Sequence, residues 1–141
     1  MADTLLSKDI ENCVKSEWGG QAYFSSFCSQ SRGVAIFIKK DFPAKVLDTF
    51  SDNDGNILAL MIEIENKQIL IQGVYGPNRD EPDFFKNKCF NKLNEWNPHY
   101  VICVGDWNIA LEPEIDTLNY QNFNNPRART ELKKKSMNLT F

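Results

Sequence analysis

The sequence of 141 residues predicts a mixed α/β chain of the layered α+β type, in which helices pack on a β-sheet. Two kinds of segment support this prediction. Some carry apolar residues at helical intervals, and others are short, rich in aromatic and β-branched residues, and bounded by turn residues. Most strand-like segments follow one another with only a short polar turn between them, and such hairpin links are typical of a layered α+β sheet.

The first half of the chain is expected to form a short helix followed by strands. Leucine, isoleucine and valine side chains at near-helical spacing predict a helix over 5–16, which Gly19 and Gly20 end. The strands are expected at 21–27, 32–40, 44–50, 56–65 and 68–75. The Asp-Asn-Asp-Gly sequence at 52–55 predicts a hairpin turn, and the alternation of isoleucine with glutamate at 62–65 predicts a strand with one solvent-facing side.

The second half is expected to contain a helix over 81–96, a strand over 100–108 and a helix over 126–137. In the first of these segments large apolar side chains recur at helical intervals, acidic residues precede lysines, and Pro98 follows the end. The strand is apolar as far as Val104, which predicts that it is buried. A sheet built of these strands alone would have an exposed edge or an uncovered face, so we expect self-association through exposed sheet edges.

Composition places the chain among globular proteins of one domain, residues 1–141, with 42% hydrophobic and 25% charged residues. The net charge of −3 argues against a protein of the histone kind, whose whole surface is basic. It is compatible with a nucleic-acid enzyme, because a local basic strip or a bound divalent cation is enough to attract phosphates. The four cysteines form no CxxC motif, which favours reduced thiols. Because there is no signal core and no apolar run of ~18–20 residues, we expect an intracellular protein, nuclear or cytoplasmic, without a membrane segment.

Two strand-like segments end in residues that can do chemistry. The sequence VICVGDWN delivers Asp106 and Asn108 to the end of a strand, where a carboxylate beside an amide can orient a water, a phosphate or a metal ion. On the residues alone, Asp106 as a cap of the following turn is an equally good interpretation. The sequence GVYGPN ends in Tyr75 and Asn78, whose phenol and amide can donate to phosphate oxygens. Taken by itself, this segment is better explained as an ordinary turn with proline at its second position.

The motifs VYGPN and VGDWN, with a helix expected between them, resemble those of the endonuclease/exonuclease/phosphatase superfamily. More closely, the chain is similar to the apurinic-type endonuclease domain of vertebrate long interspersed element (LINE) retrotransposons, from residue 3 to the C-terminus. The stretches that carry this similarity are EWGGQAYFSS, SQSRGVAIFIKK, VYGPNRDEPDFF, VGDWNIALEPEID and NPRARTELKK. The resemblance implies a four-layer α/β sandwich of two packed sheets flanked by helices, and Mg²⁺-dependent nicking of one strand of double-stranded DNA.

The resemblance also implies roles for individual residues. Asp106 matches an aspartate that activates or positions the attacking water, and Asn108 matches an asparagine that holds the scissile phosphate. Tyr75 matches a tyrosine that contacts and stabilises that phosphate, whereas Asn78 supports the same loop. Phosphodiester hydrolysis needs an oriented water and stabilisation of the phosphate charge, and Mg²⁺, or Mn²⁺ in its place, needs only one or two carboxylates.

The chain departs from the family pattern at both ends. Asp3 stands where the family has the glutamate that is its main metal ligand, and its side chain is one methylene shorter; a surface aspartate is the alternative interpretation. The family's first strand and its later Ser-Asp-His motif have no counterpart, and His99 should lie at the opposite end of the strand that carries Asp106. We therefore expect an incomplete domain, a partial sandwich, that nicks DNA far more slowly than a complete one, or not at all.

Basic side chains offer weaker candidates for nucleic-acid binding. Arg32 could meet a phosphate, although a charged residue that enters a strand is more often simply solvated. Arg127, Arg129 and the lysines at 133–135 would form a basic helix face, which either touches DNA non-specifically or is solvated.

Three functions are compatible with these observations. The first is a Mg²⁺-dependent DNA-nicking domain of a LINE-type retrotransposon. The second is a non-catalytic, retrotransposon-derived remnant that lacks the metal-binding glutamate and the catalytic histidine. The third is a phosphatase of the same superfamily that acts on a lipid or inositol phosphate, which the stretches SQSRGVAIF and NPRAR disfavour.

Overall fold

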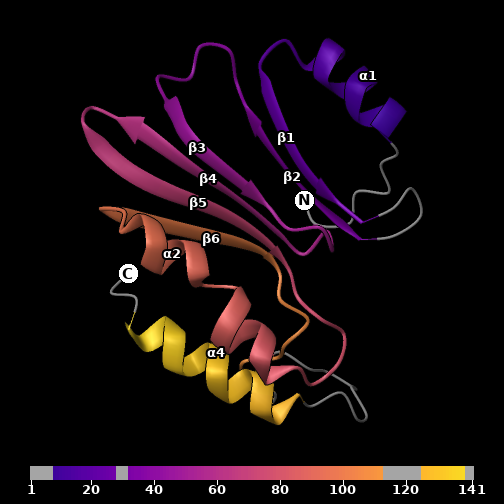
Figure 1. Cartoon of the computed structure of the whole chain (residues 1–141), viewed down its shortest axis with the longest axis vertical. Helices are drawn as coiled ribbons and strands as arrows, with labels where there is room; N and C mark the ends of the chain where they lie inside the picture. The colour runs from indigo at the N-terminus through magenta and orange to yellow at the C-terminus, as the bar shows by residue number, and fades with distance from the viewer. Residues whose placement is uncertain (1–7, 28–31, 113–124, 139–141) are drawn as a thin grey trace. The chain divides into compact units, whose positions relative to one another are not determined.

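The computed structural model describes residues 8–27, 32–112 and 125–138 (Figure 1). They divide into two units, the first containing the described residues up to Tyr75 and Lys92–Asp106, and the second containing Gly76–Asn91 and the described residues from Trp107 onward. The elements of the first unit are α1 (Lys8–Trp18), β1 (Gln21–Ser26), β2 (Gly33–Ile38), β3 (Lys45–Ser51), β4 (Ile57–Ile64), β5 (Lys67–Tyr75), α2 (Asn91–Trp96, all but its first residue) and β6 (Tyr100–Asp106). Those of the second are the π-helix η1 (Phe84–Lys88) and α4 (Pro126–Asn138). The mixed α+β class expected from the sequence is confirmed.

Helix α1 packs against the two-stranded antiparallel sheet of β1 and β2. The Lys15 ammonium lies 5.4 Å from the centre of the Phe24 ring, and the ring of Trp18 lies 5.1 Å from that of Phe37. The helix ends at Trp18, two residues later than expected, and Gly19 follows it with a φ of 68°. Glycine adopts this left-handed conformation without steric cost, so the predicted stop is confirmed.

The second sheet contains four strands in the order β3-β4-β5-β6. Neighbouring strands are antiparallel except for β5 and β6, which are parallel. The predicted turn at 52–55 joins β3 to β4, and Glu65 and Asn66, with φ values of 49° and 62°, form a two-residue turn between β4 and β5. A parallel pair requires a longer crossover connection, and the chain between β5 and β6 supplies one that includes α2.

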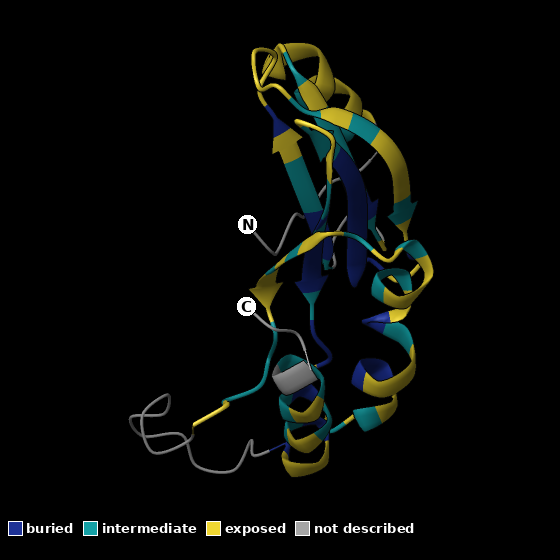
Figure 2. Cartoon of the chain, turned by 90° about the vertical axis from the view of Figure 1, so that its left-hand side faces the viewer, coloured by how far each residue is buried: buried dark blue, intermediate teal, exposed yellow. Residues whose placement is uncertain are grey.

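The core of the first unit lies where the two-stranded sheet packs on β4 and β5. Ile38, Leu60 and Ile62 are buried at its centre, and each such side chain contributes roughly 1.5–3 kcal/mol by leaving water. The partly buried side chains around them are Tyr23, Ile36, Ala44, Val46, Ile64, Ile69 and Ile71. Buried residues accordingly concentrate in the strands (Figure 2).

Strand β4 is buried on both faces over most of its length, which corrects the expected solvent-facing side. All residues from Ile57 to Ile62 are buried, and only the last two residues of the strand are partly exposed. The strand has neighbours on both edges, so it occupies the interior of the sheet. Its nearly continuous apolar run is typical of such a strand.

Strand β6, in contrast, is more exposed than its apolar sequence predicts. Tyr100, Ile102 and Val104 share one face and are 56%, 48% and 52% exposed, so the expectation of a buried strand is wrong for this face. Val101 and Cys103, on the other face, are partly buried. Among the described residues β6 pairs only with β5, and the two-stranded sheet packs on β4 and β5. The uncovered face expected from the sequence therefore lies on β6.

The single helix expected over 81–96 is two shorter helices, η1 and α2. In the second unit η1 packs against α4, and the ring of Trp107 stacks on that of Phe90 with centroids 6.5 Å apart. Among the described residues of this unit, the buried hydrophobic ones are Phe84, Phe85, Cys89, Phe90, Ala128 and Leu132. Adjacent residues of the π-helix, Phe84 and Phe85, are both buried, and their rings lie edge to face with centroids 4.9 Å apart.

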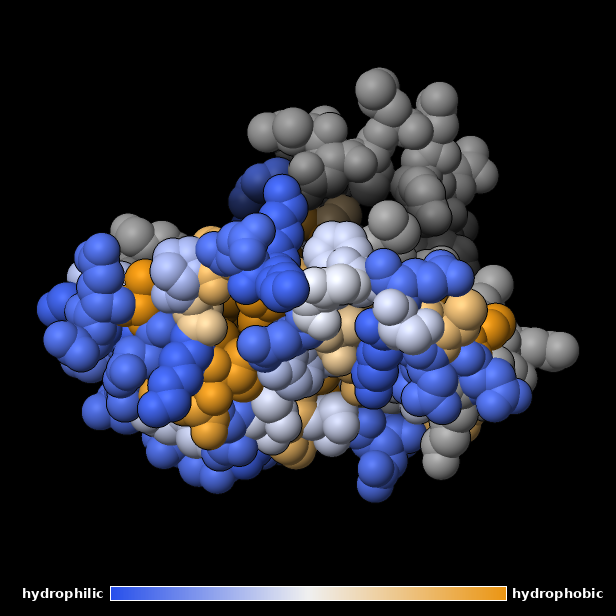
Figure 3. Space-filling model, turned by 90° about the horizontal axis from the view of Figure 1, so that it is seen from above, coloured by the Kyte–Doolittle hydropathy of each residue, from blue (hydrophilic) through white to orange (hydrophobic). Residues whose placement is uncertain are grey.

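None of the described helices is long and apolar enough to cross a membrane. The face seen in Figure 3 is mainly hydrophilic, with smaller apolar areas between the polar side chains. Exposed apolar residues scattered in this way are normal for a folded protein, whereas those of β6 are contiguous.

Candidate functional site

Tyr75 and Asp106 lie side by side at the carboxyl ends of β5 and β6. They are the last register pair of the parallel ladder, which begins at Ile69 and Tyr100. Asp106 is exposed and Tyr75 is partly exposed. Register partners point to the same face of a sheet, and neighbouring strands lie about 4.8 Å apart. A carboxylate and a phenol from the two predicted motifs are thus brought together within the first unit.

Asn56 holds the end of the strand that carries Tyr75. The Tyr75 backbone N–H donates to the Asn56 carbonyl at 2.8 Å, and Asn56 Nδ2 donates to the Tyr75 carbonyl at 2.7 Å. Asn56 is itself buried, at the end of the β3–β4 hairpin. Sequence reasoning missed this residue, although the Asp-Asn-Asp-Gly turn directly before it was a usable signal.

Asp52 in turn fixes the hairpin. One of its carboxylate oxygens, Oδ1, accepts hydrogen bonds from the backbone N–H groups of Asn56 and Ile57, at 2.8 and 2.9 Å, and from Ser25 Oγ at 3.0 Å. The side chain is buried. Three donors on Oδ1 offset part of the cost of burying this carboxylate, and they join the turn to β1 through one side chain.

Glycine at position 105 lets β6 reach the end of β5. Its φ is 150°, and a Cβ at this position would overlap the carbonyl oxygen of Val74. Only glycine tolerates both conditions. The VGDWN motif therefore needs glycine at this position, because the backbone directly before Asp106 approaches the backbone of Val74 closely.

Asn108 lies in the second unit and ties two loops together. Its backbone is left-handed, with a φ of 50°, and its Nδ2 donates to the Gly76 carbonyl at 2.7 Å. Asn125 Nδ2 donates to the Asn108 carbonyl at 3.2 Å. The two predicted motifs thus also meet in this unit, through the amide of Asn108 and the backbone of the GPN turn.

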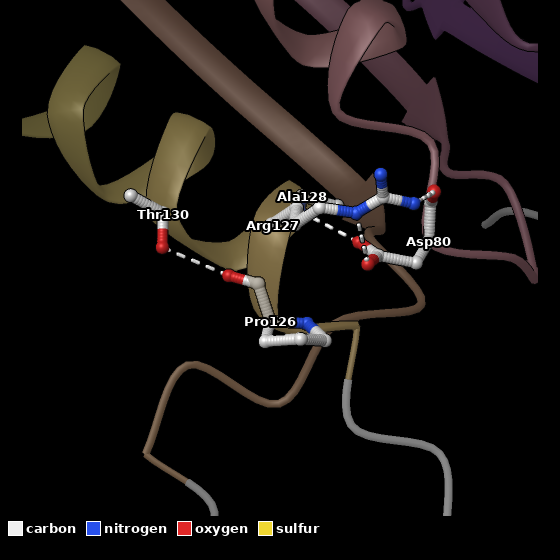
Figure 4. Close-up of polar contacts among 5 residues, drawn as sticks. All are labelled: Asp80, Pro126, Arg127, Ala128 and Thr130. Carbon is white, nitrogen blue, oxygen red and sulfur yellow. Dashed lines mark hydrogen bonds and ion pairs between the residues drawn. The ribbon is translucent and has the colours of Figure 1, made fainter.

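Asp80 links the GPN turn to the start of α4 (Figure 4). Its Oδ1 accepts from the Ala128 backbone N–H at 2.8 Å, and its Oδ2 pairs with Arg127 Nε at 3.0 Å. The Ala128 backbone hydrogen bond, together with the Arg127 hydrogen bonds and charge, lowers the pKa of Asp80. A carboxylate at a helix N-terminus also interacts favourably with the helix dipole. Sequence reasoning missed this residue, because 48 positions separate the two partners.

The hydrogen bonds and ring contacts described for the remaining candidate residues involve partners other than Tyr75, Asp106 and Asn108. Asn78 is exposed in its turn. The guanidinium of Arg32 lies 5.3 Å from the centre of the Phe27 ring. The backbone carbonyl of Arg32 accepts a hydrogen bond from the Phe27 N–H at 3.3 Å. Asp3 lies outside the described residues. His99 is exposed and its Nδ1 accepts from the Gln68 N–H at 3.0 Å, which confirms its place at the opposite end of β6 from Asp106.

The donor set near Asp106 suits a hydrated Mg²⁺ only in part. Asp106 offers one exposed carboxylate, and Mg²⁺ accepts one or two such ligands while it keeps several waters. In the part of the chain that the structure describes, no three acidic, histidine or cysteine side chains lie together. Burial raises the pKa of Cys103 to about 11, so this thiol stays protonated at neutral pH.

Comparisons with known proteins add no assignment. A scan against models of known protein families finds no match, and a search of curated proteins finds no similar sequence.

Proposed function

We propose that the chain is a nuclease domain that nicks one strand of double-stranded DNA with the help of Mg²⁺ or Mn²⁺. The observation that carries this proposal is the register pair of Tyr75 and Asp106 at the carboxyl ends of β5 and β6. In open parallel α/β sheets ligands bind outside the carboxyl ends of the strands, and β5 and β6 are the parallel pair of this otherwise antiparallel sheet. The resemblance of VYGPN and VGDWN to the LINE endonuclease motifs gives the reaction class.

The chemistry assigned to the chain's own residues follows from their functional groups. The Asp106 carboxylate accepts a proton from water, and the water oxygen forms a bond to phosphorus while the bond from phosphorus to the 3′ oxygen breaks. The released 3′ oxygen takes up a proton from solvent water, and Asp106 later returns its proton to solvent. The Tyr75 hydroxyl donates a hydrogen bond to a non-bridging phosphate oxygen. A bound Mg²⁺ would act as a Lewis acid on the phosphate.

The finer fold that accompanies this proposal is a partial four-layer α/β sandwich. In the first unit α1, the two-stranded sheet and the four-stranded sheet follow one another as layers. The Lys92 ammonium of α2 lies 5.0 Å from the ring of Phe50, whose register partners in the sheet share the face opposite the core. This contact supports a helix on the far side of the larger sheet. Such a nuclease would act inside the cell, where DNA is present.

The test is nicking of supercoiled plasmid by the purified full chain, with and without Mg²⁺. We expect nicking that requires the cation. It should be slow, because the shorter Asp3 stands in place of the family's metal-binding glutamate and the family's Ser-Asp-His motif has no counterpart in this sequence. Asp106→Asn should lower the rate at least about 100-fold, which is the usual worth of a general base. Tyr75→Phe should lower it by about 100–1,000-fold, because one donor to the phosphate is lost.

Asp41→Asn is the matched control, because it removes one exposed carboxylate remote in sequence from both motifs. It should nick at the rate of the unchanged chain. If a chain shown to be folded by near-UV circular dichroism does not nick, or if Asp106→Asn nicks as fast as Asp41→Asn, the proposal is wrong. Duplex binding without nicking would instead favour the non-catalytic remnant.

A further inference from the structure

Strand β6 is an edge strand of the sheet that the described residues form, and it carries a contiguous apolar strip. In the described part of the chain it pairs on one side only, with β5. Its residues Tyr100, Ile102 and Val104 are each about half exposed on one face. From Tyr100 to Gly105 the strand carries no charged residue. A long, uncharged edge strand is a template for pairing with another strand.

The opposite edge of the same sheet has the features that prevent such pairing. Strand β3 begins at Lys45 and carries Asp48 near its middle. Its register shifts between Val46 and Asp48, so the strand is irregular there. Charges and bulges are the devices with which proteins protect an edge strand from added strands. Within the described residues, β3 therefore has features that oppose the addition of a strand, and β6 has no charge between Tyr100 and Gly105.

We propose that β6 is a homodimer interface, in which it pairs antiparallel with β6 of a second copy of this chain. Charge selects this orientation. In a parallel pair the Asp106 carboxylates of the two copies would lie side by side and repel each other. In an antiparallel pair each Asp106 meets the end of the partner strand that holds His99 and Tyr100, which carries no negative charge.

The sequence of β6 is complementary to itself in this orientation. When Ile102 lies opposite Ile102 of the second copy, each Tyr100 lies opposite a Val104, and all these side chains share one face. The pairing is isologous and closes after two copies. Because β3 then forms both outer edges of the combined sheet, further copies do not add. A dimer, rather than a fibre, is the expected product.

The first experiment is sedimentation equilibrium of the full chain over a range of concentrations. We expect a monomer–dimer equilibrium that Ile102→Lys weakens by about tenfold or more, since an inward-facing charge on an edge strand opposes pairing. Leu47→Lys is the matched control, because Leu47 is an exposed apolar residue, 39% exposed, on the protected edge strand β3. This variant should dimerise like the unchanged chain.

A second measurement needs no variant and so does not depend on how well Ile102→Lys folds. Hydrogen exchange of the unchanged chain should show backbone amides of 100–106 that become slower to exchange as protein concentration rises, while those of β3 do not change. A folded chain that is monomeric at all concentrations overturns the proposal, as do larger oligomers or equal effects of Leu47→Lys and Ile102→Lys. Neither measurement depends on nuclease activity.

Discussion

At the scale of single residues, Gly105 is the position whose backbone is most constrained. We expect Gly105→Ala to lower the free energy of unfolding by about 2–4 kcal/mol, because the methyl group strains a positive φ and meets the Val74 carbonyl. Gly19→Ala is the control, since Gly19 also has a positive φ but no atom lies within 4 Å of its added Cβ, and it should cost only about 1 kcal/mol. Urea unfolding followed by tryptophan fluorescence measures both. Equal losses would contradict the steric argument.

Asp80 should make the stability of the fold depend on pH. Its folded-state pKa is lowered below the ordinary value of 3.8, chiefly by the Ala128 N–H. A group of this kind stabilises the fold fully above its unfolded pKa, and this stabilisation is lost as the pH falls through the folded-state value. Asp80→Asn should therefore lower the urea midpoint at pH 7, and the difference from the unchanged chain should shrink as the pH falls below 3.8.

The control for this experiment is Asp83→Asn. Asp83 is an exposed neighbour whose carboxylate accepts one long hydrogen bond, at 3.5 Å from Asn87. It should leave the urea midpoint nearly unchanged at both ends of the pH range. A difference between Asp80→Asn and the unchanged chain that stays constant with pH would show that the ionised carboxylate is not what stabilises α4.

At the scale of elements, the β3–β4 hairpin depends on one buried carboxylate. Asp52→Ala leaves the Ser25 hydroxyl and the N–H groups of Asn56 and Ile57 without this acceptor, so we expect a loss of about 2–4 kcal/mol in the free energy of unfolding. Asn53→Ala, at an exposed position of the same turn, should cost about 0.5 kcal/mol or less. Chemical denaturation of both variants tests this. Similar costs would mean that turn propensity, not the carboxylate, sets the hairpin.

Elements differ in how well the sequence predicted them. Turn residues located the hairpin at 52–55 and the end of α1, because backbone preference is a local property. The break between η1 and α2 was not predicted, since the apolar spacing over 81–96 is also compatible with one helix. The exposure of β6 was predicted wrongly, because an apolar run does not tell whether another element covers it.

At the scale of the whole molecule, charge argues against a strongly basic DNA-binding surface. The net charge is −3, and on α4 the side chains of Arg127, Lys133 and Lys134 are each paired with a carboxylate. We therefore expect Lys133→Gln with Lys134→Gln to change duplex affinity by less than about twofold, because paired charges add little to the attraction of phosphates. Fluorescence anisotropy at low salt measures this. A loss of tenfold or more would assign α4 to the DNA-binding surface.

The sequence by itself determined the strand and turn content of this protein, its α+β class, and the placing of Tyr75 and Asp106 at strand ends. These features follow from preferences that act over a few neighbouring residues. Only the tertiary structure decided that β5 and β6 are parallel neighbours, which sets Tyr75 beside Asp106, and that β6 keeps one apolar face exposed. Strand pairing and burial depend on which distant segments meet, and local sequence does not encode that.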